Sequence, residues 1–343
     1  DQAAPVTVGN AQLQADTLGL TLPFDLDDEE ALYAWIQAMF TLTLPGPIAT
    51  NALRPDFTLN TGFDITQIQS GAEIGEPPNM LTYLRGTFIP EAIETAQQLN
   101  GYQPVDINGH RVMSLAPDAA IDLANPVQAM ALARLNNATF LDDGTLVYAS
   151  TLGLMETALS ASQTLADIPQ LQRAMATLDA PLMSSMVLGP GNFLPGIPME
   201  LFQPDSQEDI AGVMLTMQAQ EPAPVVLAAI AGSTAGGPVS LIEPPEGSTP
   251  DPVALASQPR SVSKFALVYA TPEDAQTAAQ QIESRLSTGS SSTSDRPWSE
   301  MFASWSAVPD AEQSSVLLTI EWIDRPAMTQ RLVFSRDLGF ITG

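Results

Sequence analysis

Apolar residues recur at helical spacing close to the start of the chain. Between Asp28 and Phe40, large apolar side chains lie three or four residues apart, which places them on one face of a helix. Acidic residues fill positions 27–30, where carboxylates cap free N–H groups and interact with the positive end of the helix dipole. We therefore interpret this acidic run as a helix start and not as a calcium site. The apolar face consists of Leu32, Trp35, Ile36, Met39 and Phe40.

Strand and helix patterns then alternate as far as residue 178. The sequence predicts a strand over 80–88, followed by a helix over 90–99 with proline in its first turn. Two further helices are predicted over 154–165 and 168–178. Mixed strands and helices in this order are typical of an α+β protein and not of a doubly wound one.

Two dipeptides predict hairpins within this stretch. Asn108-Gly109 and Asp143-Gly144 each separate two short segments that read as strands. Both dipeptides readily adopt the positive φ angles that tight hairpin turns require. We therefore expect antiparallel pairing on both sides of each turn.

Beyond residue 181 the chain becomes rich in loop signals. Proline, glycine and serine gather over 188–198, 243–252 and 288–297. A serine-rich loop such as the last of these is normally mobile unless neighbouring groups hold it. The elements predicted between the loops are strands over 225–231, 264–270 and 316–322 and a helix over 272–286, which Thr271 and Pro272 begin as N-cap and first helical residue.

The tetrapeptide LVYA occurs twice, at Leu146–Ala149 and at Leu267–Ala270. Each copy precedes a threonine-bearing turn and a helical pattern, and an ungapped overlay of 146–165 on 267–286 gives six identities in twenty. Chance similarity between simple strand–helix patterns is one explanation. We interpret the match as one strand–helix unit used once in each of two similar domains.

The expected fold is therefore α+β, with two similar domains that each consist of an antiparallel sheet and helices, ferredoxin-like in kind. Long Pro/Gly-rich loops belong to the second domain. The expected boundaries are an extended N-terminal segment over 1–23, a first domain over 24–180 and a second domain over 181–343. An extended terminal segment of this kind could reach into an adjacent subunit.

The charge balance excludes some classes of partner. Asp and Glu number 39 against 12 Lys and Arg, which gives a net charge of -27. Nucleic acids and anionic lipid surfaces bind through clustered Lys and Arg, so neither is expected as a partner. Membrane insertion is not expected either, since the strongest apolar run, 225–231, is far shorter than the roughly 20 residues that a spanning helix needs.

Composition also predicts where the protein works. Charged residues make up only 15% of the chain, below the roughly 25% usual for soluble domains, and such a weakly charged surface suits an exported protein. The chain begins at Asp1 without a basic and apolar leader, as expected of a mature chain after signal-peptide removal. We therefore predict an extracellular, periplasmic or cell-surface location.

The candidate chemistry is sparse. The chain has no cysteine, and its single histidine, His110, follows a hairpin turn, so neither a thiolate site nor a histidine-rich metal site is expected. Ser261 and Lys264 match the S-x-x-K nucleophile motif, but they lead into a strand, where positions three apart point to opposite faces. The glycine-rich stretch 232–237 lacks the lysine of a phosphate-binding loop. No cofactor is predicted.

Two further features have both a structural and a functional interpretation. Asp142 and Asp143 could help to bind Ca²⁺, although two acids in a hairpin turn are ordinary turn chemistry. Arg85 lies in a predicted strand of a chain that has few arginines. A structural ion pair is the simpler role for it, and the recognition of a carboxylate or phosphate through its planar guanidinium is the alternative.

Three hypotheses about function follow. The leading one is a non-catalytic exported protein that binds other proteins, above all copies of itself, in an extracellular filament, tube or coat. The alternative is a binding module that holds a small ligand or a partner in the crevice between its two domains, with Arg85 as a candidate contact. A hydrolase that acts through paired carboxylates is the least favoured, because no pair can be chosen among 39 acids.

Overall fold

The computed structural model describes residues 6–38, 42, 44–162, 164–193, 224–234, 261–323 and 329–342. Within these residues the strands of the first half are β1 (Val6–Asn10), β2 (Ile68–Glu76), β3 (Asn79–Gly86), β4 (Gln103–Ile107), β5 (His110–Ser114), β6 (Asn137–Phe140) and β7 (Leu146–Ala149). Those of the second half are β8 (Ser184–Leu188), β9 (Ala228–Ser233), β10 (Val262–Val268), β11 (Phe302–Asp310) and β12 (Ser315–Trp322). The α-helices are α1 (Ala11–Leu18), α2 (Glu29–Ala38), α3 (Gly46–Asn51), α4 (Phe57–Thr61), α5 (Pro90–Leu99), α6 (Pro126–Ala131), α7 (Leu152–Ser160), α8 (Pro169–Thr177), α11 (Pro272–Thr288), α12 (Thr329–Phe334) and α13 (Gly339–Thr342).

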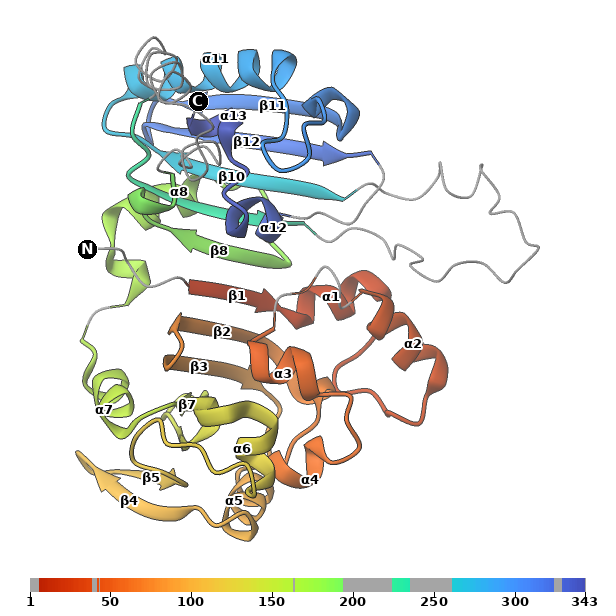
Figure 1. The fold of residues 1–343 in the computed structure, drawn as a ribbon, viewed down its shortest axis with the longest axis vertical. Coiled ribbons are helices and arrows are strands. Elements are labelled where there is room, and N and C mark those ends of the chain that lie inside the picture. The colour runs from red at the N-terminus through yellow and green to blue at the C-terminus, as the bar shows by residue number, and fades with distance from the viewer. Residues whose placement is uncertain are drawn as a thin grey trace, which may run out of the picture.

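All of these strands belong to one antiparallel sheet that runs the length of the molecule (Figure 1). Its strand order is β11-β12-β10-β9-β8-β1-β2-β3-β7-β6-β5-β4. The α+β class with antiparallel pairing is therefore as predicted. The two expected hairpins are also confirmed: β4 pairs with β5 across Asn108-Gly109, where both φ angles are positive, and β6 pairs with β7 across Asp143-Gly144.

β1, residues 6–10, lies at the centre of this sheet. β1 pairs with β2 on one side and with β8 on the other, so that Val6 lies opposite both Ile74 and Val187. The next residues form α1, whose first turn is capped by the side chain of Asn10. The expectation of an extended segment over 1–23 is therefore wrong for α1, residues 11–18, which are helical. The helix was missed because its buried residues are mostly small, which leaves little apolar periodicity in the sequence.

Cross-strand neighbours lie on the same face of a sheet, so they trace its two faces. One row, from β8 to β7, consists of Met186, Thr7, Glu73, Thr82 and Tyr148. The next row along the strands, from β9 to β7, consists of Ile230, Val187, Val6, Ile74, Leu81 and Ala149, and it lies on the opposite face.

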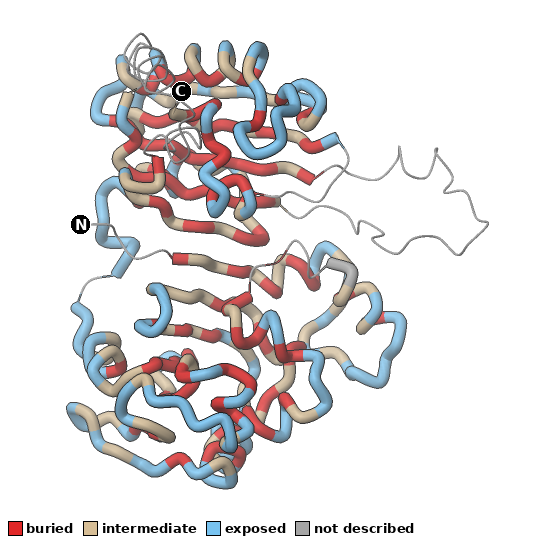
Figure 2. Tube along the Cα trace, viewed as in Figure 1, coloured by how far each residue is buried: buried red, intermediate tan, exposed pale blue. Residues whose placement is uncertain are grey.

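Each face has its own helices. Met186 packs in the core cluster of α11, α12 and α13, and Tyr148 packs in the cluster that contains Ile93 of α5. On the opposite face, Ala149 packs with Met155 of α7, and Ile230 packs with Ala174 of α8. The sheet is thus buried along its middle, with helices over both sides (Figure 2).

This arrangement corrects the interpretation of the LVYA repeat. Both copies do precede a helix capped by threonine, Thr151 for α7 and Thr271 for α11. However, α7 and α11 lie on opposite faces of the sheet, so the two copies do not mark equivalent units. The identical tetrapeptide reflects two buried strand ends and not a repeated strand–helix unit.

The helix that matches α11 is α5. Both begin with the dipeptide Pro-Glu, and both lie on the same face of the sheet. α5 follows β3, which pairs with β7, the last strand of the first half, and α11 follows β10, which pairs with β12, the last strand of the second half. Each buries the residues three, six and seven positions after its proline. These are Ile93, Ala96 and Gln97 in α5 and Ala275, Ala278 and Ala279 in α11.

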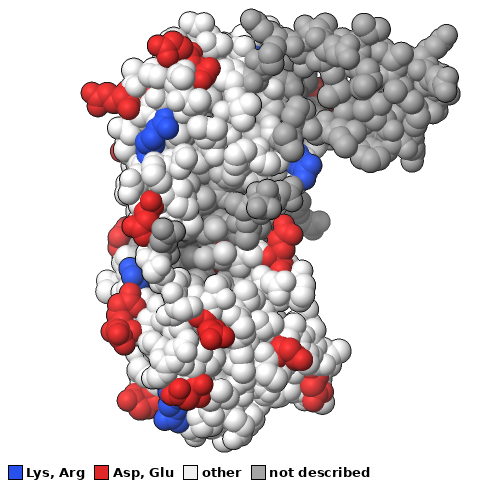
Figure 3. All heavy atoms as spheres, turned by 90° about the vertical axis from the view of Figure 1, so that its left-hand side faces the viewer, with Lys and Arg blue, Asp and Glu red and all other residues white. Residues whose placement is uncertain are grey.

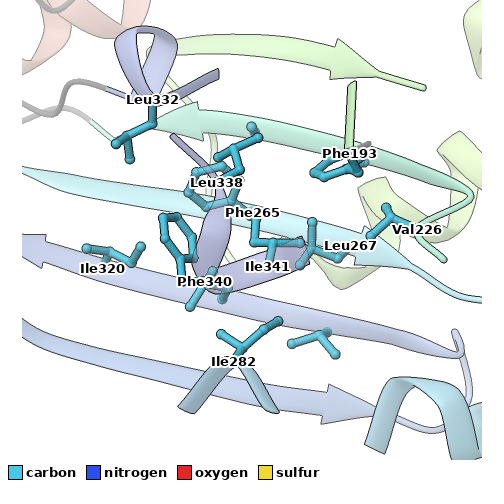
Figure 4. Packing of buried hydrophobic residues seen from close by; sticks show 14 of the residues in the cluster. Phe193, Val226, Phe265, Leu267, Ile282, Ile320, Leu332, Leu338, Phe340 and Ile341 are labelled. Carbon is cyan, nitrogen blue, oxygen red and sulfur yellow. The ribbon is translucent and has the colours of Figure 1, made fainter. Parts of the chain in front are cut away.

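The core of the second half is built on β10. Phe265 and Leu267 point toward α13, where Phe340 packs edge-on against Phe265 with ring centroids 6.1 Å apart (Figure 4). Trp298 stacks on Phe302 with ring planes 6° apart and also contacts Phe340. Fully buried aromatic rings contribute most to such a core, and here they fix the positions of the short helices near the C-terminus.

Candidate functional site

A pocket of about 310 Å³ lies in the second half, beside the end of β12. Its walls come from the loop that follows α11, from the 3-10 turn at Trp298–Glu300, from the end of β12 and from α12. Two guanidinium groups line it, from Arg296 and Arg331, together with the hydroxyl-bearing residues Thr293, Ser294 and Ser335. Its apolar lining consists of Met301, Trp322 and Leu332. The site therefore combines hydrogen-bond donors with an apolar surface.

The loop wall is held in place by a buried carboxylate. Asp337 is only 2% exposed, and its two oxygens accept hydrogen bonds from the hydroxyl groups of Ser291 (2.6 Å), Ser292 (3.0 Å) and Thr293 (2.9 Å) and from the backbone N–H of Ser292 (2.8 Å). Burying a carboxylate is costly unless donors replace its water. The serine-rich loop that the sequence predicts to be mobile is therefore fixed by a residue of its own chain.

The arginines differ in their partners. The Nη2 group of Arg296 donates to the backbone carbonyl of Glu300 at 3.0 Å, and its Nε lies 3.8 Å from the Glu300 carboxylate. Among the residues that the structure describes, no carboxylate forms an ion pair with Arg331. Arg331 is exposed on α12 and can direct its guanidinium group to a ligand.

Hydrogen bonds behind the pocket fix α12 against the sheet. The indole N–H of Trp322 donates to Ser263 on β10 at 2.8 Å, and Ser263 shares a second hydrogen bond of 2.6 Å with Thr329. Thr329 in turn donates to the backbone carbonyl of Gly232 on β9. Arg331 is two residues further along the same helix. The apolar wall and the helix that carries Arg331 are thus attached to the same two strands, β9 and β10.

Arg85 lies elsewhere. It is on β3, with 68% of its side chain exposed, and its Nη2 donates to Asp143 at 2.8 Å while its Nε donates to Thr145 at 3.3 Å. Hydrogen bonds from Thr145, together with Arg85, hold the pKa of Asp143 below its ordinary value. Two residues that the sequence singled out for separate roles therefore form an ion pair with each other.

Metal binding finds no support at this turn. No group of three or more His, Asp or Glu side chains that could hold a metal ion occurs within the described ranges. Asp142 is exposed beside the Arg85–Asp143 pair.

The glycine-rich stretch 232–237 is described only as far as residue 234. Gly232 lies in β9, where a side chain would clash with the backbone oxygen of Ser184. Residues 235–237 lie outside the described residues, as do Met39, Phe40, residues 194–198 and all of 243–252.

The S-x-x-K residues are not arranged for nucleophilic chemistry. Lys264 lies on β10 and is buried, with an ion pair to Asp179, which follows α8. The hydrogen bond from Lys264 lowers the pKa of Asp179. The single lysine of the chain is therefore a structural ion-pair partner of Asp179. The single histidine, His110, follows its hairpin turn as predicted and lines a second, smaller pocket.

The surface carries charged side chains at low density. Figure 3 shows one face, on which acidic and basic side chains lie in small groups within a mainly uncharged surface. Among the described residues, no helix is both long and apolar enough to cross a bilayer. Comparisons of the chain with protein-family models, curated proteins and solved structures found no match. The site geometry is therefore the basis for a functional proposal.

Proposed function

We propose that this chain is a non-catalytic binding protein and that the pocket beside β12 holds a small organic anion with an apolar body. The observation that carries the proposal is the presence of Arg296 and Arg331 in one partly apolar pocket. They are two of only 12 Lys and Arg residues in a chain of net charge -27. Because the overall field repels anions, an anion binds only where guanidinium groups act at short range.

The chemistry of the lining favours a carboxylate. A guanidinium group offers two parallel N–H donors that match the two oxygens of a carboxylate, and nearby hydroxyl groups add single donors. Trp322, Met301 and Leu332 provide the surface for an aromatic or aliphatic body. The volume of about 310 Å³ is at the lower end of the range of about 300–1,000 Å³ for small-molecule sites.

Several features support a binding role over hydrolysis. Two carboxylates line the pocket, Glu300 and Asp337. Both oxygens of Asp337 accept hydrogen bonds from the serine-rich loop, and Glu300 lies beside Arg296. Neither carboxylate is thus arranged as a free proton donor opposite a nucleophile, which paired-carboxylate hydrolysis requires.

Self-association is the second candidate. Leu59, Leu99 and Leu123 are each at least 67% exposed. Two side-chain hydrogen bonds, from Asn100 to the carbonyl of Asn60 and from Asn125 to the carbonyl of Asn100, bring the three turns that carry them together. Exposed leucines on neighbouring segments favour contact with another protein surface. Light scattering over a wide concentration range tests it: a mass that rises with concentration supports association, and a constant monomer mass contradicts it.

Strand addition is not the favoured route for such association. β4 and β11 are the outer strands of the sheet. β4 contains Pro104, which lacks an N–H group, and in β11 the N–H of Ala307 donates to the Glu283 carboxylate at 2.7 Å. Proline and side chains that occupy edge donors both oppose pairing with a further strand.

We also propose a location outside the cytoplasm and an arrangement in two similar domains. The location outside the cytoplasm is supported by the low charge density of the chain. The arrangement as two similar ferredoxin-like domains is supported by the match between α5 and α11 in starting residues, sheet face and buried positions.

A thermal-shift panel tests the proposed function. We expect carboxylates with an apolar body, such as phenylacetate and hexanoate, to raise the melting temperature in proportion to the logarithm of their concentration, and their neutral amides to leave it unchanged. Arg296→Gln and Arg331→Gln should each reduce the shift. Arg54→Gln is the matched control, because Arg54 forms an exposed ion pair with Asp56 in the first half. Equal responses to acid and amide would contradict the proposal.

A further inference from the structure

A second pocket, of about 250 Å³, lies in the first half where the sheet opens between β5 and β6. These strands pair only at Met113 with Ala138 and at Ser114 with Asn137, whereas β6 continues beside β7 as far as Phe140. Past the last pair, the hydroxyl of Thr139 donates to the backbone carbonyl of Arg111 at 2.9 Å and so bridges the opening. The pocket occupies this opening and is bounded on one side by α5.

Two side chains of opposite charge, Arg111 and Glu94, line this pocket. Arg111 projects from β5 and Glu94 from α5, and the two form an ion pair. Both are accessible, with 61% and 37% of their side chains exposed. The Glu94 carboxylate also accepts a hydrogen bond from Gln98 at 2.9 Å, which holds its orientation. The pocket therefore offers one cation and one anion side by side.

The remaining lining is largely apolar. Phe140 is partly exposed and Met113 is 6% exposed, and both are backed by Ala138 and Leu146, which are at most 1% exposed. Gln97 is also buried, and its side chain is hydrogen-bonded to Tyr148, so its polar group is engaged by the protein. An apolar group that entered the pocket would contact hydrocarbon and aromatic surface.

From this combination we infer that the pocket binds a free α-amino acid with an apolar side chain. Its carboxylate would bind Arg111, its ammonium group would bind Glu94, and its side chain would contact Phe140 and Met113. A zwitterion replaces the single Arg111–Glu94 pair with two charge-assisted pairs, which compensates both charges. It has no net charge, so the field of a chain of charge -27 does not repel it. The site is separate from the proposed anion pocket and does not depend on that proposal.

The volume restricts the size of the ligand. About 250 Å³ is enough for one amino acid of the size of leucine or methionine and too little for a peptide to be enclosed. Glycine has the two charged groups without the apolar contact, so it should bind more weakly than leucine.

Isothermal titration of the full chain with leucine, leucinamide, N-acetylleucine and glycine tests the inference. Leucinamide lacks the carboxylate and N-acetylleucine lacks the ammonium group. We expect each of the three analogues to bind at least tenfold more weakly than leucine, because each removes a charge-assisted contact or the apolar contact. Equal affinity for leucine and leucinamide, or no heat of binding with leucine at millimolar concentration, would overturn it.

Two variants assign the contacts. Glu94→Gln should weaken leucine binding about tenfold or more and leave the weak binding of N-acetylleucine unchanged. Arg111→Gln should also weaken leucine binding about tenfold or more, and it should leave the weak binding of leucinamide unchanged. These ratios separate a lost contact from a general loss of structure, which would weaken all ligands alike. Arg54→Gln serves again as the control for an exposed ion pair. Variants that bind all ligands as the parent chain does would contradict the inference.

Discussion

The hydroxyl group of Ser291 donates to the carboxylate of Asp337 across 2.6 Å, and both residues are buried. This contact joins the loop after α11 to the turn between α12 and α13, which lie 46 positions apart in sequence. Both segments line the pocket that we propose as the binding site. The shape of that pocket therefore depends on a hydrogen-bond network centred on the buried Asp337 carboxylate.

Replacement of Asp337 by alanine should loosen this loop and destabilise the protein. The change removes the acceptor of four hydrogen bonds, and one hydrogen bond to a charged group contributes about 1.5–3 kcal/mol. Because Ser292 and Thr293 are exposed and can bond to water instead, we expect a total loss of about 2–4 kcal/mol, well below the sum of the four. Urea unfolding measures the loss, and limited proteolysis should detect new cleavage within 288–297. Asp142→Ala, at an exposed position, is the control. Unchanged stability in Asp337→Ala would contradict the role of the network.

Changes to the two partners of the Lys264–Asp179 pair should have unequal effects. Asp179→Asn leaves a buried ammonium group without its counter-ion, whereas Lys264→Met replaces the buried group with an apolar chain of similar length. We expect Asp179→Asn to lower the urea midpoint more than Lys264→Met does. The reverse order would show that Lys264 is not desolvated as the structure indicates.

The same pair predicts a dependence of stability on pH. The pKa of Asp179 is lowered from 3.8 in the folded state by the hydrogen bond from Lys264. A lowered carboxyl pKa contributes stability that is present above the ordinary pKa and is lost as the pH falls through the lowered value. The parent chain should therefore lose more stability below about pH 3.8 than Asp179→Asn does. Parallel curves of urea midpoint against pH for both proteins would count against this pair as the cause.

Proline at Thr7 should be far more damaging than alanine at the same position. β1 is bonded to a neighbour on each side, so proline removes a ladder hydrogen bond in the middle of the sheet, at a cost of about 3 kcal/mol or more. Thr7→Ala keeps the N–H group and should cost much less. Circular dichroism during urea unfolding measures both. Similar midpoints for the two variants would contradict the central position of β1.

The parts of the fold that sequence predicted well depend on local chemistry. The turn at Asn108-Gly109 and the helix start at Thr271-Pro272 are specified by residues that favour particular backbone angles or caps, and both occur as predicted. β2 and β11 were missed because one contains two glycines among polar residues and the other alternates polar and small residues at a sheet edge. Neither has the apolar run by which a strand is recognised.

The site was beyond sequence reasoning for a different reason. Asp337 is one of 39 acidic residues, and nothing near it in sequence shows that it accepts hydrogen bonds from residues 291–293. Arg296 and Arg331 belong to a loop and a short helix that tertiary packing alone brings to one pocket. The sequence singles out Arg85 because arginine is scarce, and the same scarcity applies equally to Arg296 and Arg331.

Isothermal titration with phenylacetate tests the central proposal most directly, with phenylacetamide as the neutral comparison and Arg331→Gln as the key variant. We predict that the parent chain binds phenylacetate with one site, that the amide binds at least tenfold more weakly, and that Arg331→Gln loses about tenfold in affinity while Arg54→Gln keeps it. Binding of acid and amide with the same affinity, or binding that is unaffected by Arg331→Gln, would contradict the proposal that this pocket recognises a carboxylate.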